Sequence, residues 1–125
     1  MMKILYVDDE DDIREIAQLS LELDEDFNVR CCPSGASALE TAPDYMPDMI
    51  LLDVMMPEMD GPETLTRLRA MPETSGIPIV FITARTQKHE IEHLKSIGAL
   101  GVIAKPFDPM SLADQVREYA VSAGG

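Results

Sequence analysis

The sequence contains no tryptophan, few aromatic residues (5%) and two cysteines among its 125 residues. The cysteines, Cys31 and Cys32, are adjacent, and neighbouring side chains of an extended strand point to opposite faces, so we expect no disulfide between them. Free thiols are typical of a reducing compartment, which favours a cytoplasmic location. Long apolar runs are also missing, and the stretch before the first acidic residues is short. We therefore expect neither a membrane span nor a signal peptide.

Basic residues are scarce as well, with 10 Lys and Arg against 23 Asp and Glu and a net charge of −13. This balance disfavours a nucleic-acid surface, which needs clustered basic side chains, and disfavours contact with anionic lipid. A hydrophobic content of 46% in a chain of this length is enough for one domain with a buried core. We expect that domain to cover residues 1–121, followed by a tail, residues 122–125, that is frayed or begins a linker.

Five apolar runs recur at fairly even spacing and predict five strands. They cover residues 4–7, 27–32, 49–52, 79–82 and 102–104. Four of the runs are continuous, as expected for strands that are covered on both faces. The second run is interrupted by Asn28 and Arg30 and therefore predicts an edge strand.

Helical spacing of apolar residues fills the gaps between these strands. A first helix is predicted by the helical spacing of Ile13, Ile16, Ala17 and Ser20, with Leu23 beyond them. A weaker pattern over residues 91–97 predicts the fourth helix, and Leu112, Val116 and Tyr119-Ala120 predict one face of the last. The predicted N-terminal caps of the second, third and fifth helices are Ser34, Asp60 and Asp108, the last with Pro109 in its first turn.

Five successive βα units predict an α/β fold with a doubly wound, five-stranded parallel sheet and helices on both faces. The flavodoxin-like strand order 2-1-3-4-5 places the first and third strands side by side at the switch point of the sheet. Ligands bind beyond the carboxyl ends of the strands at such a point. Asp8-Asp9 and Asp53 follow those two strands in the sequence.

Three strand ends thus carry charged residues, namely Asp8-Asp9, Asp53 and Lys105. Two carboxylates about 4 Å apart repel by roughly 4 kcal/mol at an effective dielectric constant of 20. A divalent cation and a lysine are the natural counter-charges for such a cluster. A group arranged in this way can bind and stabilise a phosphoryl group.

The order and spacing of these motifs resemble the receiver domain of the two-component response regulators, of the single-domain type found among chemotaxis regulators. The resemblance covers nearly the whole chain. The motifs that carry it are Asp8-Asp9, Asp53 with Met56-Pro57 and Asp60-Gly61 after it, Thr83-Ala84, and Lys105-Pro106-Phe107.

The resemblance implies that Asp53 is the phosphoacceptor and that Asp8, Asp9 and Asp53 bind Mg²⁺ (with Mn²⁺ as an alternative ion) together with the backbone carbonyl of Met55. Mg²⁺ takes few protein carboxylates and keeps several waters, which agrees with this sparse set. Residues 10–12 are interpreted only as acids that favour the N-terminus of the first helix.

The resemblance also implies that Lys105 pairs with the phosphoryl group or with the acidic cluster, that the Lys105-Pro106 bond is cis, and that the hydroxyl of Thr83 bonds a phosphoryl oxygen. Taken alone, Lys105 would be interpreted as a surface lysine and Thr83 as a β-branched strand residue. One position departs from the family pattern, because Val102 stands where an aromatic side chain often switches between two positions. The phosphorylation chemistry does not depend on it, but the output mechanism does.

The predicted function is that of a phosphoacceptor in a phosphorelay. A sensor histidine kinase or histidine phosphotransfer protein would donate phosphate to Asp53, and the product would bind a downstream protein partner or pass the phosphate on. We expect a monomer or weak dimer that is not a turnover enzyme. The alternatives are the N-terminal receiver of a longer regulator, a module that is never phosphorylated, a flavin-binding module, and a small phosphatase using the Asp-x-Asp pair of Asp9 and Asp11.

Overall fold

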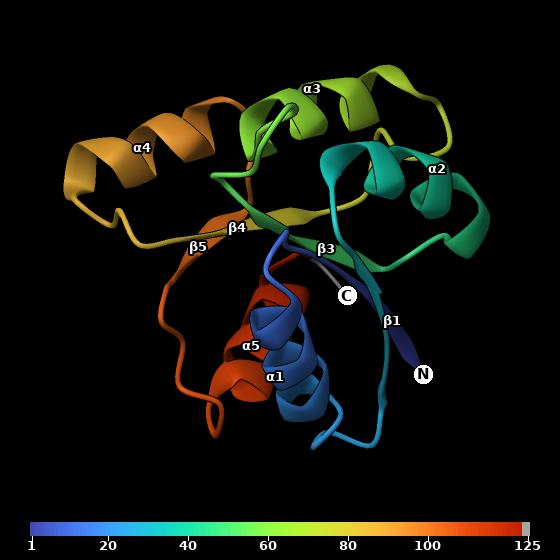
Figure 1. Ribbon diagram of the computed structural model, residues 1–125, viewed down its shortest axis with the longest axis vertical. Coiled ribbons are helices and arrows are strands. Elements are labelled where there is room, and N and C mark those ends of the chain that lie inside the picture. Colours follow the sequence, from blue (N-terminus) through green and yellow to red (C-terminus); the bar gives the residue numbers. More distant parts are fainter. Residues whose placement is uncertain (124–125) are drawn as a thin grey trace.

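The computed structural model describes residues 1–123, in which strands and helices alternate along the chain (Figure 1). The strands are β1 (Met2–Val7), β2 (Phe27–Cys32), β3 (Met49–Asp53), β4 (Ile79–Thr83) and β5 (Gly101–Ala104). The helices are α1 (Asp11–Leu21), α2 (Gly35–Tyr45), α3 (Gly61–Ala70), α4 (Lys88–Ser96) and α5 (Leu112–Ser122). The predicted tail therefore begins inside the last turn of α5, and its residues 124–125 lie outside the described part of the chain.

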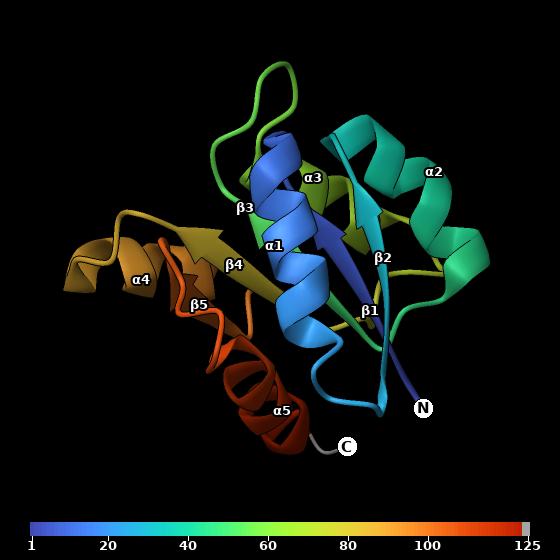
Figure 2. The same cartoon turned by 60° about the horizontal axis from the view of Figure 1, so that its bottom comes forward.

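The strands form one parallel sheet in the order β2-β1-β3-β4-β5, which confirms the predicted α/β fold and its strand order. Every residue of β3 and β4 is buried, as their continuous apolar runs predicted. Strand β2 alternates between buried and exposed residues at one edge of the sheet. Because all strands run in the same direction, their carboxyl ends meet at one edge (Figure 2).

Helices cover both faces of the sheet and divide the core into two clusters. Helices α2, α3 and α4 lie on one face and α1 and α5 on the other (Figure 1). The alternation of side chains along β1 shows the division, since Leu5 and Val7 pack in the first cluster and Ile4 and Tyr6 in the second. The central strands are therefore held from both sides, and they form a rigid base for the loops at the carboxyl edge.

Two of the predicted helix caps are confirmed. The side chain of Ser34 accepts a hydrogen bond from the backbone N–H of Ser37 (3.0 Å) at the start of α2. Asp60 accepts one from the N–H of Glu63 (2.9 Å) at the start of α3. Each bond satisfies an N–H group that has no partner within its helix.

The predicted start of the last helix is wrong. Asp108 does accept a backbone hydrogen bond, but from Met110 (2.9 Å), and this closes a turn before the helix. Helix α5 begins at Leu112, whose N–H bonds to the carbonyl of Asp108. An aspartate can close a local turn as well as cap a helix, and Asp108 followed by proline is compatible with both.

The residues whose spacing predicted α1 do not all lie on its buried face. The side chains of Ile16 and Leu23 are 41% and 63% exposed, whereas Ala17, Ser20 and Leu21 are buried. Helix α1 ends at Leu21, so Leu23 lies beyond it and no longer follows the helical spacing. Ser20 is compatible with the buried face because its hydroxyl donates to the carbonyl of Ile16 (2.7 Å).

Strand β5 has a side-chain partner on its outer edge. The hydroxyl of Tyr119 in α5 donates to the carbonyl of Val102 (3.0 Å) and accepts from its N–H (3.3 Å). The ring lies against Gly101, where an added Cβ would stand 2.1 Å from a ring carbon. Glycine at this position therefore allows the ring to approach the strand.

Candidate functional site

Four of the predicted site residues lie at the carboxyl edge of the sheet. Asp53 is the last residue of β3 and Thr83 the last of β4. Asp8 directly follows β1 and Lys105 directly follows β5. Since β1, β3, β4 and β5 are neighbours in register, residues that are far apart in the sequence meet here.

The ammonium group of Lys105 lies among three carboxylates. Its Nζ is 3.0 Å from Asp8 Oδ2, 3.4 Å from Asp53 Oδ2 and 3.5 Å from Glu10 Oε1. Asp8 is fully buried and Asp53 is 5% exposed, so both depend on protein groups for compensation. One cation for three anions leaves the cluster with excess negative charge.

Asp8 is held by further hydrogen bonds. Its Oδ2 accepts from the hydroxyl of Tyr6 (3.1 Å), and its Oδ1 accepts from the backbone N–H of Glu10 (3.0 Å). The guanidinium of Arg14 donates to the backbone carbonyl of Asp8 (2.7 Å) and also pairs with Asp11. The orientation of Asp8 is therefore determined by its own strand and by the first turn of α1.

Burial and the neighbouring carboxylate of Asp8 raise the pKa of Asp53 to about 6, against the opposing influence of Lys105. Burial alone would favour the neutral amine of Lys105. Its hydrogen bond to Asp8 and the charges of Asp53, Asp8 and Glu10 outweigh this influence and raise its pKa. Burial, followed by the charge of Asp8, raises the pKa of the Tyr6 phenol. At neutral pH the cluster thus holds an ionised Asp53 beside a charged Lys105.

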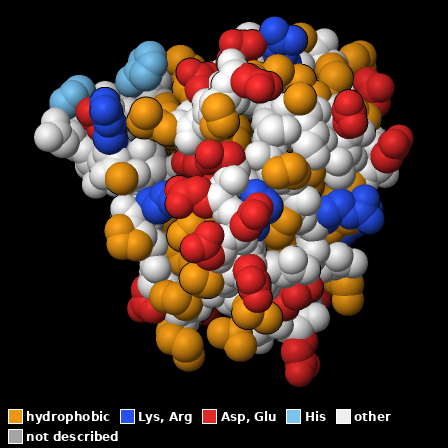
Figure 3. Space-filling view, viewed as in Figure 1, with side chains coloured by type: hydrophobic (Ala, Val, Ile, Leu, Met, Phe, Trp, Pro, Cys, Tyr) orange, Lys and Arg blue, Asp and Glu red, His pale blue; other side chains and the backbone are white. Residues whose placement is uncertain are grey.

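The site contains oxygen ligands for a hard cation. One carboxylate oxygen each of Asp8, Asp9 and Glu10 lie within 4.8 Å of one another. On the face of the molecule shown in Figure 3, acidic side chains gather near the centre, around the junction of β1 and α1. Carboxylate oxygens with excess negative charge suit Mg²⁺. The interpretation of Glu10 as a helix-terminal acid alone is wrong, because Glu10 contacts Lys105 and belongs to this cluster.

The loop after β3 is held close to Asp53 by Gly61. The N–H of Gly61 donates to the carbonyl of Val54 (2.8 Å). A Cβ at this position would lie 2.5 Å from the backbone oxygen of Asp53, closer than any real contact allows. Met55 lies in the same loop and is 63% exposed. Its backbone carbonyl is the one that the resemblance predicts to bind Mg²⁺.

Thr83 is buried at the end of β4, and its hydroxyl oxygen accepts a hydrogen bond from the N–H of Arg85 (3.0 Å). This contact orients the hydroxyl and leaves its proton available to another acceptor.

The N–H of Lys105 donates to the carbonyl of Thr83 (2.9 Å), and the Lys105-Pro106 bond is cis, as the resemblance implied. Val102 is half-buried, and its backbone is bonded to Tyr119.

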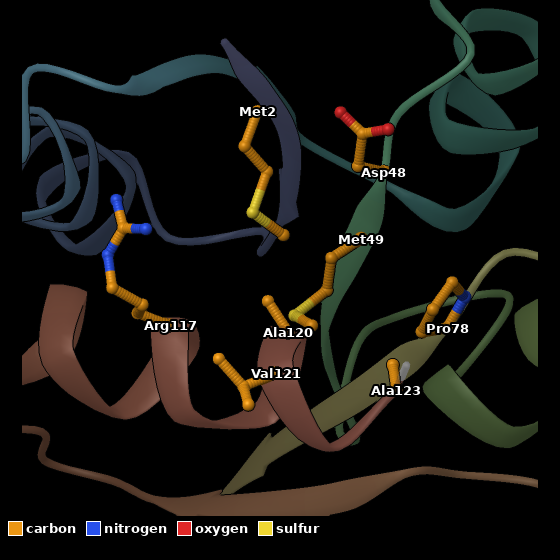
Figure 4. Close-up of a pocket in the computed structure, with 8 residues that line it drawn as sticks. All are labelled: Met2, Asp48, Met49, Pro78, Arg117, Ala120, Val121 and Ala123. Atoms are coloured by element: carbon orange, nitrogen blue, oxygen red, sulfur yellow. The ribbon is translucent and has the colours of Figure 1, made fainter. Parts of the chain in front are cut away.

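A pocket at the opposite end of the sheet is unrelated to this cluster (Figure 4). It is formed by Met2 and Met49 at the starts of β1 and β3, by Pro78 just before β4, and by the end of α5. None of the predicted site residues lines it.

Sequence reasoning missed Tyr6, Glu10 and Arg14 as members of the site. Tyr6 precedes Asp8 by two residues, so both side chains leave β1 on the same face, and this spacing is the signal that could have identified it. Arg14 lies one helical turn after Glu10 and reaches back to the carbonyl of Asp8.

Comparison with known proteins identifies a family for this arrangement. The family model described as the response regulator receiver domain matches residues 4–117. The transcriptional regulatory protein CseB of Streptomyces coelicolor is 38% identical over 114 residues, which cover 91% of this chain and 47% of that protein. An uncharacterised 14.6 kDa protein of Leptolyngbya boryana is 33% identical, with 97% of this chain and 92% of that protein covered.

Solved structures agree with this result. The chemotaxis protein CheY4 of Vibrio cholerae has a TM-score of 0.87 and 32% identity, with 95% of this chain and 98% of that chain covered. A response regulator of Chloroflexus aurantiacus gives 0.86 and 32%, with 96% and 98% covered. The chain spans about half the length of CseB and also 50% of the response regulator Rre1 of Synechocystis. Within residues 1–123, no helix has the length and apolarity needed to cross a bilayer.

Proposed function

The chain belongs to the response regulator receiver domain family of two-component systems, and on this basis we propose that it accepts a phosphoryl group from phosphohistidine onto Asp53. The observation that carries the proposal is the shared contact of Lys105 with Asp8 (3.0 Å) and Asp53 (3.4 Å) at a buried strand end. A nucleophile, a charge-stabilising cation and oxygen ligands for a metal are thereby supplied at one place.

The transfer uses Asp53 as a nucleophile. Because its pKa is about 6, the carboxylate is mostly ionised at neutral pH and can attack the phosphorus atom. A carboxylate oxygen forms a bond to phosphorus as the phosphorus–nitrogen bond of phosphohistidine breaks. The electron pair of that bond returns to the imidazole nitrogen, which takes up a proton, and Asp53 becomes an acyl phosphate.

Lys105 and Thr83 stabilise the phosphoryl oxygens in this proposal. The ammonium of Lys105 already lies between Asp8 and Asp53, so a short movement of its flexible side chain brings it to a phosphoryl group on Asp53. The hydroxyl of Thr83 donates its free proton to another phosphoryl oxygen. Phosphoryl transfer depends mainly on such positioning and charge stabilisation.

The residues that would hold Mg²⁺ are Asp8, Asp9 and Asp53 with the carbonyl of Met55. Bound there, Mg²⁺ (or Mn²⁺) supplies positive charge to the phosphoryl oxygens. Glu10 lies in the same cluster, and its carboxylate also contacts the ammonium group of Lys105.

The partners in this proposal are a sensor histidine kinase or a histidine phosphotransfer protein as donor and a protein that responds to the phosphorylated state. The chain would act in the cytoplasm as a monomer or weak dimer, without direct contact with nucleic acid or membrane. It would not turn over small phosphate esters. Because several relatives are about twice as long, an additional output domain in the whole protein is an alternative consistent with this role.

The proposal is tested by intact mass spectrometry after incubation with acetyl phosphate and Mg²⁺. The wild type should gain one phosphoryl group, and Asp53→Asn should gain none. Asp60→Asn is the matched control: Asp60 is an exposed carboxylate in the same loop, and asparagine can retain its capping role. Labelling of Asp53→Asn equal to that of the wild type would contradict the site, and a folded wild type that gains nothing would contradict the function.

A further inference from the structure

The carboxylate of Asp8 has two donors on one oxygen. Tyr6 Oη and Lys105 Nζ both lie within hydrogen-bond distance of Asp8 Oδ2, at 3.1 and 3.0 Å, while the N–H of Glu10 bonds to Oδ1. Asp8 is fully buried, and a buried carboxylate that loses its partners is strongly destabilised. If one of the two donors moves away, the Asp8 carboxylate therefore depends more strongly on the other.

The two donors differ in mobility. Lys105 ends a flexible chain, is 16% exposed and shares its ammonium with Asp53 and Glu10. Tyr6 is fully buried in the middle of the sheet, on a strand flanked by β2 and β3, and its ring packs in the core beneath α1 and α5. The phenol cannot leave Asp8 without disturbing that core, whereas the ammonium can move within the site.

We propose that Tyr6 is a positioning residue that keeps the Asp8 carboxylate oriented for a divalent cation, both before and after Lys105 turns from Asp8 to a phosphoryl group on Asp53. This inference rests on the proposed function and deepens it. The rigid phenol maintains one bond to Asp8 Oδ2 in both states, so Lys105 is free to leave. Without the hydroxyl, Lys105 is the one side-chain donor to the Asp8 carboxylate left within residues 1–123. Before phosphorylation, Asp8 would then hold Lys105 more firmly. After Lys105 moves to the phosphoryl group, Asp8 would lose its orientation.

The test compares Tyr6→Phe with Tyr45→Phe. Tyr45 is also buried, but its hydroxyl takes no part in the cluster, since it donates to the carbonyl of Asn28 (2.8 Å). The dissociation constant for Mg²⁺ is measured by isothermal titration calorimetry on unphosphorylated protein. Outer partners of metal ligands typically contribute about tenfold or more to affinity, so Tyr6→Phe should bind Mg²⁺ about tenfold more weakly. Tyr45→Phe should remain within about twofold of the wild type.

A second measurement separates positioning from a general effect on stability. The rate of phosphorylation by acetyl phosphate at saturating Mg²⁺ should fall in Tyr6→Phe and remain unchanged in Tyr45→Phe. The losses caused by Tyr6→Phe and Lys105→Met should be non-additive in the double variant, because both residues act on the same oxygen of Asp8. Additive losses would contradict the shared role.

A third measurement needs no variant and applies even if Tyr6→Phe fails to fold. On addition of Mg²⁺ and the phosphoryl analogue beryllofluoride to the wild type, the Lys105 ¹⁵Nζ resonance should shift and the Tyr6 ¹³Cζ resonance should stay close to its starting position. A Tyr6 resonance that moves to the position of an unbonded phenol would overturn the inference.

The failures of the two proposals are distinguishable. A wild type that binds Mg²⁺ but is never phosphorylated contradicts the proposed function, while the effect of Tyr6→Phe on Mg²⁺ affinity still decides the positioning role. A wild type that is phosphorylated, with Mg²⁺ affinity in Tyr6→Phe within about twofold of it, contradicts the inference alone. A wild type that binds no Mg²⁺ contradicts the inference.

Discussion

Charged side chains are paired differently at the two ends of the sheet. At the amino end, the N–H of Lys3 donates to Asp48 (2.7 Å) and its ammonium donates to the carbonyl of Tyr45 (2.8 Å), so each charged group has its own partner. At the carboxyl end, Lys105 is shared by Asp8, Asp53 and Glu10. The unbalanced second arrangement is the one that suits a cation or a phosphoryl group.

Replacing the lysine at each end should give the largest contrast. Lys105→Met removes the cation nearest to Asp53, and loss of one charge-stabilising group typically slows a reaction by about 100-fold or more. We expect phosphorylation by acetyl phosphate to slow to that extent in Lys105→Met and to be unchanged in Lys3→Met, measured by intact mass against time. A large loss of thermal stability in Lys105→Met without a loss of phosphorylation would contradict the assigned role.

Removing one carboxylate at each end should change stability in opposite directions. In metal-free protein at pH 7, ionised Asp53 is destabilising, because folding raises its pKa from 3.8 to about 6. Since a tenfold change in proton affinity corresponds to about 1.4 kcal/mol, Asp53→Asn should stabilise the protein by up to about 3 kcal/mol. Asp48→Asn changes the charge-assisted bond from the backbone N–H of Lys3 into a weaker neutral one and should destabilise the protein by up to about 1 kcal/mol. Urea unfolding in EDTA measures both, and a loss of stability in Asp53→Asn would mean that this carboxylate is already well compensated.

The same carboxylate predicts a pH dependence with a definite sign. Between about pH 4 and pH 6 the folded state binds the Asp53 proton and the unfolded state does not, so this group makes stability fall as pH rises. The advantage of Asp53→Asn over the wild type should therefore be absent below about pH 4 and complete above about pH 6. Phosphorylation of the wild type should decline below pH 6 as Asp53 becomes neutral. An advantage that does not change with pH would contradict the raised pKa.

Mg²⁺ should act at the carboxyl end only. At 100 times its dissociation constant, a ligand that binds only the folded state stabilises it by about 2.7 kcal/mol. We expect this gain in the wild type and in Asp48→Asn, and its loss in Asp9→Asn. Because Asp9 is exposed, its replacement should alter metal-free stability by no more than about 0.5 kcal/mol. Equal stabilisation of Asp9→Asn and the wild type would remove Asp9 from the proposed ligand set.

The sequence predicted the backbone of this site better than its side-chain network. Continuous apolar runs reveal buried parallel strands, and the topology then brings Asp8, Asp53 and Lys105 to one edge. The bond from Tyr6 to Asp8 and the contact of Glu10 with Lys105 depend on rotamers and on the start of α1, which spacing does not determine.

The errors outside the site have a similar origin. Asp108 can close a turn or cap a helix, and the choice depends on how α5 packs on the sheet. Ile16 and Leu23 extend a plausible helical pattern, but α1 turns its Ala17 and Leu21 side inward and ends before Leu23. Tertiary contacts decide between patterns that are equally helical.

The hydroxyl of Tyr119 has a consequence for how copies of this protein meet. An outer strand of a sheet offers its free N–H and C=O groups to any extended chain that comes alongside, and this is a common route to aggregation. In β5, which has four residues, Tyr119 occupies both polar groups of Val102. An incoming strand would have to displace a ring that rests on Gly101 before it could pair there. Pairing of a further strand is thereby obstructed at Val102, in the middle of this edge of the sheet.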